Sequence, residues 1–108
     1  MREIEELEIR VAIQIASLGM ISSDIRSISF DFVKEFSLLK FRVNFSDQPH
    51  EQALENMSCI LTEVEAGLPI ELKKIEEEYL VTPVPTRPVN LSKVVYARCE
   101  SSDFLPLA

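Results

Sequence analysis

The fold is decided by two neighbouring stretches of alternating sequence, SISFDF at residues 27–32 and LKFRVNF at residues 39–45. In both, an apolar residue occupies every second position, which is the period of a β-strand with one packed and one polar face. The short connection at residues 33–36 predicts an antiparallel hairpin, although no Asn-Gly or Asp-Gly pair fixes its turn type. On the polar face we expect a set of solvent-exposed side chains, namely Ser27, Ser29, Asp31, Lys40, Arg42 and Asn44.

Two helices are predicted beside this hairpin, and we expect them to cover its apolar face. The first spans residues 3–18, with glutamates in its first turns and Gly19 as its stop. The second spans about residues 49–67, with Pro49 at its first position and Gly67 as a left-handed cap. The stripe expected to face the core in the first helix consists of Ile4, Leu7, Val11, Ile15 and Leu18, widened by Ile9, Ile13 and Ala16.

The second half of the chain predicts further strands at about residues 70–81 and 94–99, and the first has either a bulge near Lys73-Lys74 or a division there into two short strands. Between them, the prolines of residues 82–88 require an extended loop, which is either a stiffened recognition segment or a rigid connector. The element order α-β-β-α-β-β favours an α+β two-layer sandwich, with both helices on one face of an antiparallel sheet. We expect one domain over residues 1–100 and a tail at 101–108 that either docks locally or frays.

The chain is acidic, because 18 Asp and Glu residues against 11 Lys and Arg residues give a formal net charge of −7. Phosphate binding requires clustered Lys and Arg, so neither nucleic acid nor an anionic membrane is expected as a direct ligand. The negative field favours a basic partner. The N-terminus is acidic, unlike a signal peptide, and no apolar run approaches the ~20 residues of a membrane span. We therefore expect a cytoplasmic protein.

No residue set in the sequence is equipped for catalysis or metal binding. The single histidine, His50, follows a proline at a helix start, and no nucleophile with an orienting acid can be placed beside it. Cys59 and Cys99 lack CxxC spacing and are interpreted as small buried apolar residues. Carboxylate pairs such as Glu63 and Glu65 are interpreted as solvated charges. The sequence predicts a protein that is not an enzyme and uses no cofactor or metal ion.

The densest acidic run is Glu76-Glu77-Glu78, inside the strand predicted at residues 70–81. Because side chains alternate along a strand, Glu76 and Glu78 are predicted to share one face while Glu77 points to the other. Two interpretations remain open. A basic partner would relieve the repulsion among these carboxylates, whereas charges on an edge strand would prevent sheets from aggregating.

The chain resembles the small immunity proteins of bacterial contact-dependent growth inhibition systems over roughly residues 5–100, in its N-terminal helix, its proline pair and five further stretches. The stretches are DIRSISFD (24–31), LKFRVNF (39–45), SCILTEVEA (58–66), IEEE (75–78) and VYAR (95–98). Two positions depart from the expected pattern. Gly67-Leu68 stands where an acidic and an aromatic residue are expected before Pro69, and Val94 stands where a larger aromatic residue is expected.

The resemblance implies a non-enzymatic inhibitor that binds the toxin domain of a cognate effector in the cytoplasm. Many such toxins are nucleases with a basic active site, so a basic nuclease domain is the implied partner. The alternative is a structural or adaptor domain that self-associates through the sheet edge or Phe104-Leu105, or that binds another protein. Both monomer and homodimer remain open. From charge and expected exposure, the partner-binding residues would be Asp31, Glu71, Glu76, Glu78 and Arg87.

Overall fold

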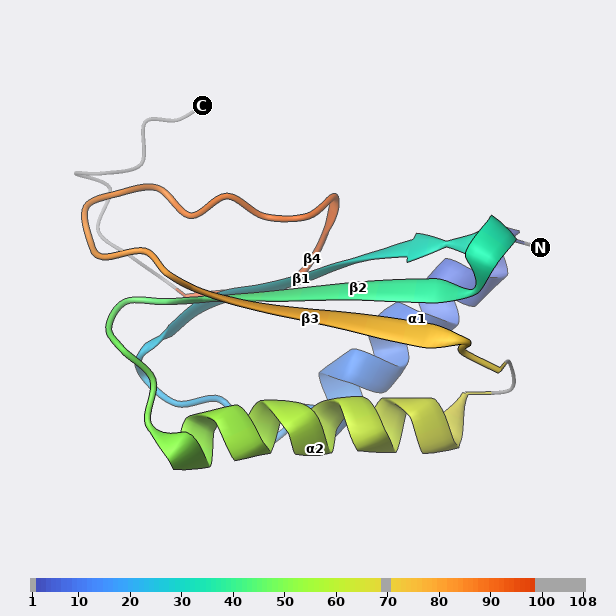
Figure 1. Ribbon diagram of the computed structural model, residues 1–108, viewed down its shortest axis with the longest axis horizontal. Helices are drawn as coiled ribbons and strands as arrows, with labels where there is room; N and C mark the ends of the chain where they lie inside the picture. The colour runs from blue at the N-terminus through green and yellow to red at the C-terminus, as the bar shows by residue number, and fades with distance from the viewer. Residues whose placement is uncertain (1, 69–70, 99–108) are drawn as a thin grey trace.

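The computed structural model describes residues 2–68 and 71–98 of the chain (Figure 1). The elements follow the predicted order α-β-β-α-β-β, which is confirmed. The predicted tail at residues 101–108 lies outside the described residues. The element bounds are α1 (Arg2–Ala16), β1 (Ile25–Val33), the short 3-10 helix η1 (Lys34–Phe36), β2 (Leu38–Phe45), α2 (Glu51–Gly67), β3 (Lys74–Val81) and β4 (Lys93–Ala97).

The four strands form one mixed sheet in the order β3-β2-β1-β4. β1 pairs antiparallel with β2, with Phe30 opposite Phe41, and it pairs antiparallel with β4 on its other side. β3 runs parallel to β2, so the prediction of a wholly antiparallel sheet is wrong. The reason is the connection between them: α2 carries the chain back along the sheet after β2, and such a crossover makes the next strand parallel.

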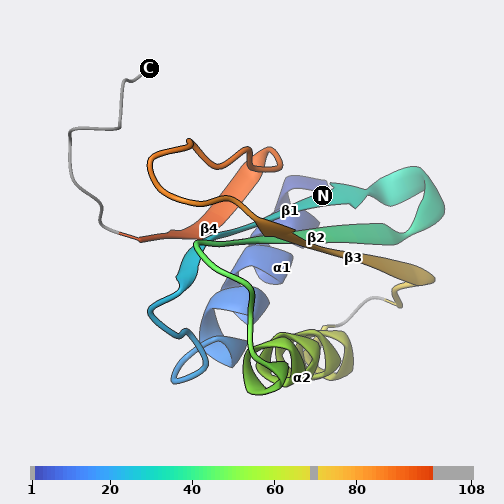
Figure 2. The same cartoon turned by 60° about the vertical axis from the view of Figure 1, so that its left-hand side comes forward.

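Both helices lie against one face of this sheet, which confirms the two-layer α+β architecture (Figures 1 and 2). Between the two layers lies a continuous apolar core. Each fully buried large side chain of this kind contributes about 1.5–3 kcal/mol to folding. The strands contribute Ile28, Phe30, Leu39, Phe41, Val43 and Phe45, and α2 contributes Met57, Ile60, Leu61 and Val64, all of them exposed by 3% or less.

α1 packs on the core through the residues predicted to widen its stripe, and not through the centre of that stripe. Its buried residues are Ile9, Ile13 and Ala16. Apolar residues occupy two faces of this helix at helical spacing, and spacing alone does not decide which of them packs. The predicted centre of the stripe faces solvent, with exposed fractions of 59% for Leu7, 42% for Val11, 63% for Ile15 and 76% for Leu18. These four residues are called the α1 stripe below.

The helix ends agree with the sequence in part. Gly19 has a φ of 79°, the left-handed conformation expected of the residue that stops α1. α2 begins at Glu51 with His50 as its N-cap residue, so Pro49 precedes the helix and does not occupy its first position. Gly67 does not adopt a left-handed φ, because the chain leaves α2 through Leu68 in an extended conformation.

The polar face of the sheet, predicted to be open, is covered by the connection between β3 and β4 (Figures 1 and 2). β3 and β4 occupy opposite edges of the sheet, so the chain between them must cross β2 and β1. Beneath it, Ser27 is 1% exposed and Ser29 and Asn44 are fully buried. The predicted exposure of these three side chains is therefore wrong. We call residues 82–92 the strap.

Candidate functional site

Asn44 is the centre of a hydrogen-bond network between the sheet and the strap. Its Nδ2 donates to Ser27 Oγ at 3.1 Å and to Val89 O at 3.3 Å. Ser27 Oγ donates to Asn90 Oδ1 at 2.6 Å, and Thr82 Oγ1 donates to Asn44 Oδ1 at 3.0 Å. Buried polar groups destabilise a fold unless they are hydrogen-bonded. Within the described residues no buried side-chain nitrogen or oxygen lacks a partner, so this network fixes the strap without leaving such a group.

Arg26 holds the first part of the strap. Its side chain is 1% exposed, and its Nη1 donates to Thr82 O at 2.7 Å and to Thr86 O at 2.5 Å. Thr86 N in turn donates to Pro83 O at 2.9 Å, which closes a turn over residues 83–86. A guanidinium presents its donors in a rigid planar fork, so one side chain can hold two backbone carbonyls in a defined geometry.

Asp31, one of the predicted partner-binding residues, holds the last part of the strap. Its Oδ1 accepts a hydrogen bond from Ser92 N at 3.3 Å and another from the Ser92 hydroxyl. Beside it, Leu91 N donates to Ser29 Oγ at 2.9 Å. The Asp31 carboxylate is half-buried and engaged within the fold. The carboxylate of Asp31 therefore holds the strap against the sheet.

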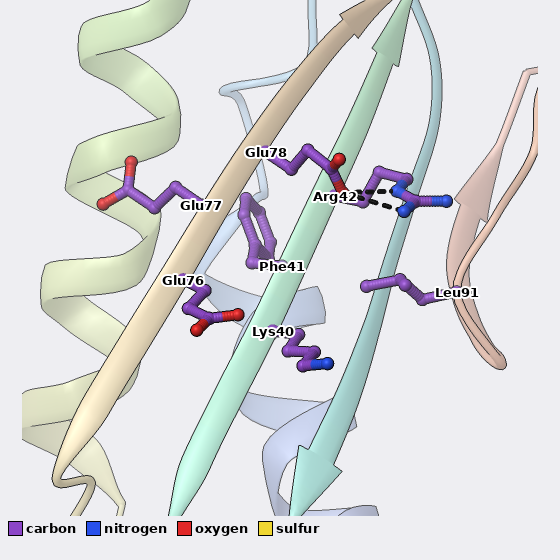
Figure 3. A pocket seen from close by; sticks show the side chains of 7 residues that line it. All are labelled: Lys40, Phe41, Arg42, Glu76, Glu77, Glu78 and Leu91. Carbon is purple, nitrogen blue, oxygen red and sulfur yellow. Dashed lines mark hydrogen bonds and ion pairs between the residues drawn. The ribbon is translucent and has the colours of Figure 1, made fainter.

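The acidic run lies on edge strand β3, and its side chains alternate as predicted. Glu76 and Glu78 project on one side of the strand and Glu77 on the other (Figure 3). Arg42 on β2 pairs with Glu78, since its Nε and Nη2 each lie 2.8 Å from Glu78 Oε1. Glu76 Oε2 lies 3.6 Å from Lys74 Nζ. Both carboxylates remain well exposed despite these ion pairs.

Glu76 and Glu78 line a groove of about 480 Å³ between β3 and the strap (Figure 3). Arg42 joins the two walls of this groove, because its Nη1 donates to Val89 O at 3.1 Å while its other nitrogens hold Glu78. One wall is thus acidic and the other is formed by the strap. The lining residues are Lys40, Phe41, Arg42, Glu76, Glu77, Glu78 and Leu91.

The groove and the strap lie within the part of the chain that matches a known family. A family model described as MafI2 immunity protein matches residues 6–100. The chain belongs to the MafI2 immunity protein family. No curated protein matches the chain at a significant level. The predicted membership of an immunity protein family is therefore confirmed, and an immunity protein acts by neutralising a toxin.

In this MafI2 immunity protein the predicted partner-binding residues do not form a single cluster. Glu76 and Glu78 share the groove, while Asp31 holds the strap. Glu71 is exposed and precedes β3, where its carbonyl oxygen accepts a hydrogen bond from the Ser37 hydroxyl at 2.5 Å. The structure therefore brings only two of the predicted acidic residues together.

Arg87, the fifth predicted residue, belongs to a different groove. It is exposed on the strap and lines a space of about 320 Å³ together with Arg26 and Arg98. Arg98 Nη1 donates to Ser23 O at 2.7 Å, so it supports the loop before β1. Three arginines thus line one groove of an acidic protein, and none of the acidic residues predicted to bind a partner lines it.

Glu77 lies on the helix side of β3, where its carboxylate contacts Tyr79. Tyr79 Oη donates to Glu77 Oε1 at 2.6 Å, and the Tyr79 ring lies 6.4 Å from the Phe45 ring, centroid to centroid. Burial raises the pKa of Tyr79, and the hydrogen bond to Glu77 and its negative charge raise this pKa further. The prediction that Glu77 points to the opposite face of β3 from Glu76 and Glu78 is confirmed.

The residues with catalytic potential are dispersed in this family member. His50 is exposed at the start of α2, and Cys59 is exposed on the same helix. The predicted burial of Cys59 is wrong because the buried face of α2 runs through Met57 and Ile60, and Cys59 lies beside it. Cys99 lies outside the described residues.

Among residues 2–68 and 71–98, no group of three or more His, Cys, Asp or Glu residues could hold a metal ion. None of the described helices has the length and apolarity that a bilayer crossing requires.

The sequence does not indicate three residues at this site: Arg42 and Leu91, which line the groove, and Val89, whose carbonyl oxygen binds Arg42. Arg42 depends on the parallel register of β2 and β3, which places it opposite Glu78. Val89 and Leu91 depend on where the strap crosses the sheet. One signal for this crossing is present in the sequence, since the polar face carries short hydrogen-bonding side chains such as Ser27 and Asn44, which suit contact with a backbone segment.

Proposed function

We propose that this immunity protein neutralises a basic nuclease toxin domain of a contact-dependent growth inhibition effector, in the cytoplasm, by binding over its active site or its substrate path. Residues 1–100 would act as one binding domain. Membership of the MafI2 family supports the neutralisation of a toxin. The observation that carries the finer proposal is the pair of exposed carboxylates, Glu76 and Glu78, on the rim of the β3 groove.

The argument from charge is as follows. A nuclease active site that binds phosphates is basic, and this chain has a net charge of −7. Opposite fields accelerate encounter and orient the partners before contact. On β3, Glu76 and Glu78 project away from the helical layer, so a partner can approach them without displacing any part of the core. Glu71, exposed just before the strand, would extend the same acidic edge.

The test measures association with the purified toxin domain encoded beside the gene for this chain. The variant Glu76→Lys/Glu78→Lys should slow association about 10-fold at low salt and flatten its salt dependence. Glu76→Lys alone, which leaves the Arg42–Glu78 pair in place, should give an intermediate effect.

The matched control is Glu63→Lys/Glu65→Lys, which changes the net charge equally on exposed positions of α2. Equal slowing by the control variant would assign the effect to overall charge and remove β3 from the interface. A toxin domain that leaves nucleic acids intact would exclude the nuclease. Cells that die when this chain is co-expressed with the toxin domain would exclude neutralisation.

A second candidate, self-association, is favoured by the α1 stripe. Leu7 and Ile15 lie four residues to either side of Val11, so two antiparallel α1 helices related by a two-fold axis through Val11 would place Leu7 of each copy against Ile15 of the other. The stripe carries no charge, and the same axis places Glu8 opposite Gln14 of the second copy. A mass that rises with concentration, and that Val11→Glu returns to the monomer, would establish this contact. A constant mass would exclude it.

A further inference from the structure

We infer that the strap is the recognition element of this protein: it presents Val84 and Val89 as apolar anchors beside the acidic groove, for an apolar patch on the toxin domain that is bordered by basic residues. This inference rests on the proposed function. It adds the part of the surface that slows dissociation of the complex with the toxin domain.

The strap is longer than its crossing requires. It starts after Val81, which pairs with Phe45 at the level of Ile25, and ends before Lys93, which pairs with Phe30. Three strand spacings across the sheet and five residues along it make a diagonal of about 22 Å. Residues 82–92 could span about 36 Å when extended. Part of the surplus chain is taken up in the turn at residues 83–86.

The strap is also held in one conformation. Thr82 O and Thr86 O are bound by Arg26, and Val89 O is bound by both Arg42 and Asn44. A binding loop that is ordered in the free protein loses little conformational entropy when a partner binds. A simple connector needs no such set of buried donors, because its backbone could be solvated by water.

The side chains of Val84 and Val89 take no part in these contacts and are exposed. Val89 is 67% exposed and Val84 is 42% exposed, although the carbonyl oxygen of Val89 faces the sheet. Arg42 connects Val89 directly to Glu78, so Val89 and the acidic rim belong to one continuous surface, and Val84 lies on the same strap. Apolar anchors surrounded by charged residues are the usual anatomy of a specific protein interface.

An exposed valine is by itself ordinary, so the test needs a matched exposed apolar residue elsewhere. Phe36 serves this purpose, because it is 69% exposed and lies in η1, at the hairpin connection away from the strap. The variants are Val84→Ser/Val89→Ser and Phe36→Ser, and both should unfold at the wild-type urea midpoint because neither position is buried.

With the purified toxin domain, the strap variant should dissociate about 10-fold faster than wild type, with an association rate and a salt dependence that stay close to wild type. Phe36→Ser should leave both rate constants unchanged. If wild type binds and protects cells while the strap variant dissociates at the wild-type rate, the inference is wrong and the proposed function stands. If wild type neither binds the toxin domain nor protects cells, the proposed function fails and this inference fails with it.

Discussion

Arg42 and Glu78 face each other across the parallel register of β2 and β3, with Nε and Nη2 of Arg42 each 2.8 Å from Glu78 Oε1. The ion pair is part of a longer chain of contacts, because Arg42 Nη1 also holds Val89 O at 3.1 Å. A single side chain thereby joins the edge strand, the sheet and the strap. Displacement of the strap therefore removes one of the contacts that orient Arg42 towards the edge strand.

Replacing Arg42 should loosen the strap more than it destabilises the whole protein. Glu78 is half exposed, so its ion pair contributes at most about 1 kcal/mol. In Arg42→Ala, we expect the free energy of unfolding to fall by about 1 kcal/mol, while amide exchange in the strap accelerates. Lys40→Ala, two positions earlier on the same face of β2, is the control. Equal exchange rates in the two variants would show that Arg42 does not hold the strap.

Arg26 should be far more sensitive to replacement. Arg26→Met removes the donor shared by Thr82 O and Thr86 O, and unsatisfied buried acceptors cost about 1–3 kcal/mol each. We expect a loss of about 3 kcal/mol in the free energy of unfolding, measured by urea denaturation. Arg98→Met, which loses a contact to a loop carbonyl at the surface, should cost less than about 1 kcal/mol. Similar losses in both variants would contradict the role assigned to Arg26.

The orientation of α1 can be tested with two isoleucines placed two residues apart. Ile13 is fully buried and Ile15 is 63% exposed. Ile13→Ala should lower the free energy of unfolding by about 3 kcal/mol, because it removes core contacts and leaves a cavity. Ile15→Ala should change it by less than about 0.5 kcal/mol. The reverse order of the two losses in urea denaturation would mean that the α1 stripe is the buried face.

Stability should depend on the ionisation of Tyr79 at high pH. The pKa of Tyr79 is raised in the folded protein above its usual value of 10.0, first by burial and then by Glu77. The neutral phenol is thus favoured by folding. Its contribution is constant below about pH 10 and decreases as the pH rises towards the folded-state pKa. The free energy of unfolding should therefore fall more steeply from pH 9 to pH 11 in wild type than in Tyr79→Phe. Parallel pH profiles would contradict the raised pKa.

The element order and the hairpin could be predicted because their signals are local. Alternation at residues 27–32 and 39–45 determines which side chains share a face, and the paired strands place Phe30 opposite Phe41 accordingly. The face of α1 could not be predicted from the same kind of pattern. Leu7, Val11 and Ile15 have helical spacing just as Ile9 and Ile13 do, and only the tertiary contacts of the helix distinguish the two sets.

Within the candidate site, the sequence predicts how residues on the same strand are arranged, but it does not predict which residues of other strands lie beside them. The shared face of Glu76 and Glu78 follows from alternation, whereas their neighbour Arg42 follows from strand order, which no local pattern encodes. The burial of Ser29 and Asn44 has the same origin. Polar residues at alternate positions are typical of a solvent face, and a distant segment that crosses this face reverses the assignment.

The way the sheet binds the strap affects how the sequence of this protein can evolve. At Thr86 and Val89 the sheet binds backbone carbonyl oxygens, which every amino acid provides. Side chains at these positions can therefore be exchanged without altering the groups that anchor the loop. A lineage could acquire a new toxin specificity by substitutions in the outer strap alone, with little loss of stability to offset elsewhere. Arg26 and Asn44, buried beneath the strap, would stay unchanged and hold its backbone in place while the exposed side chains vary.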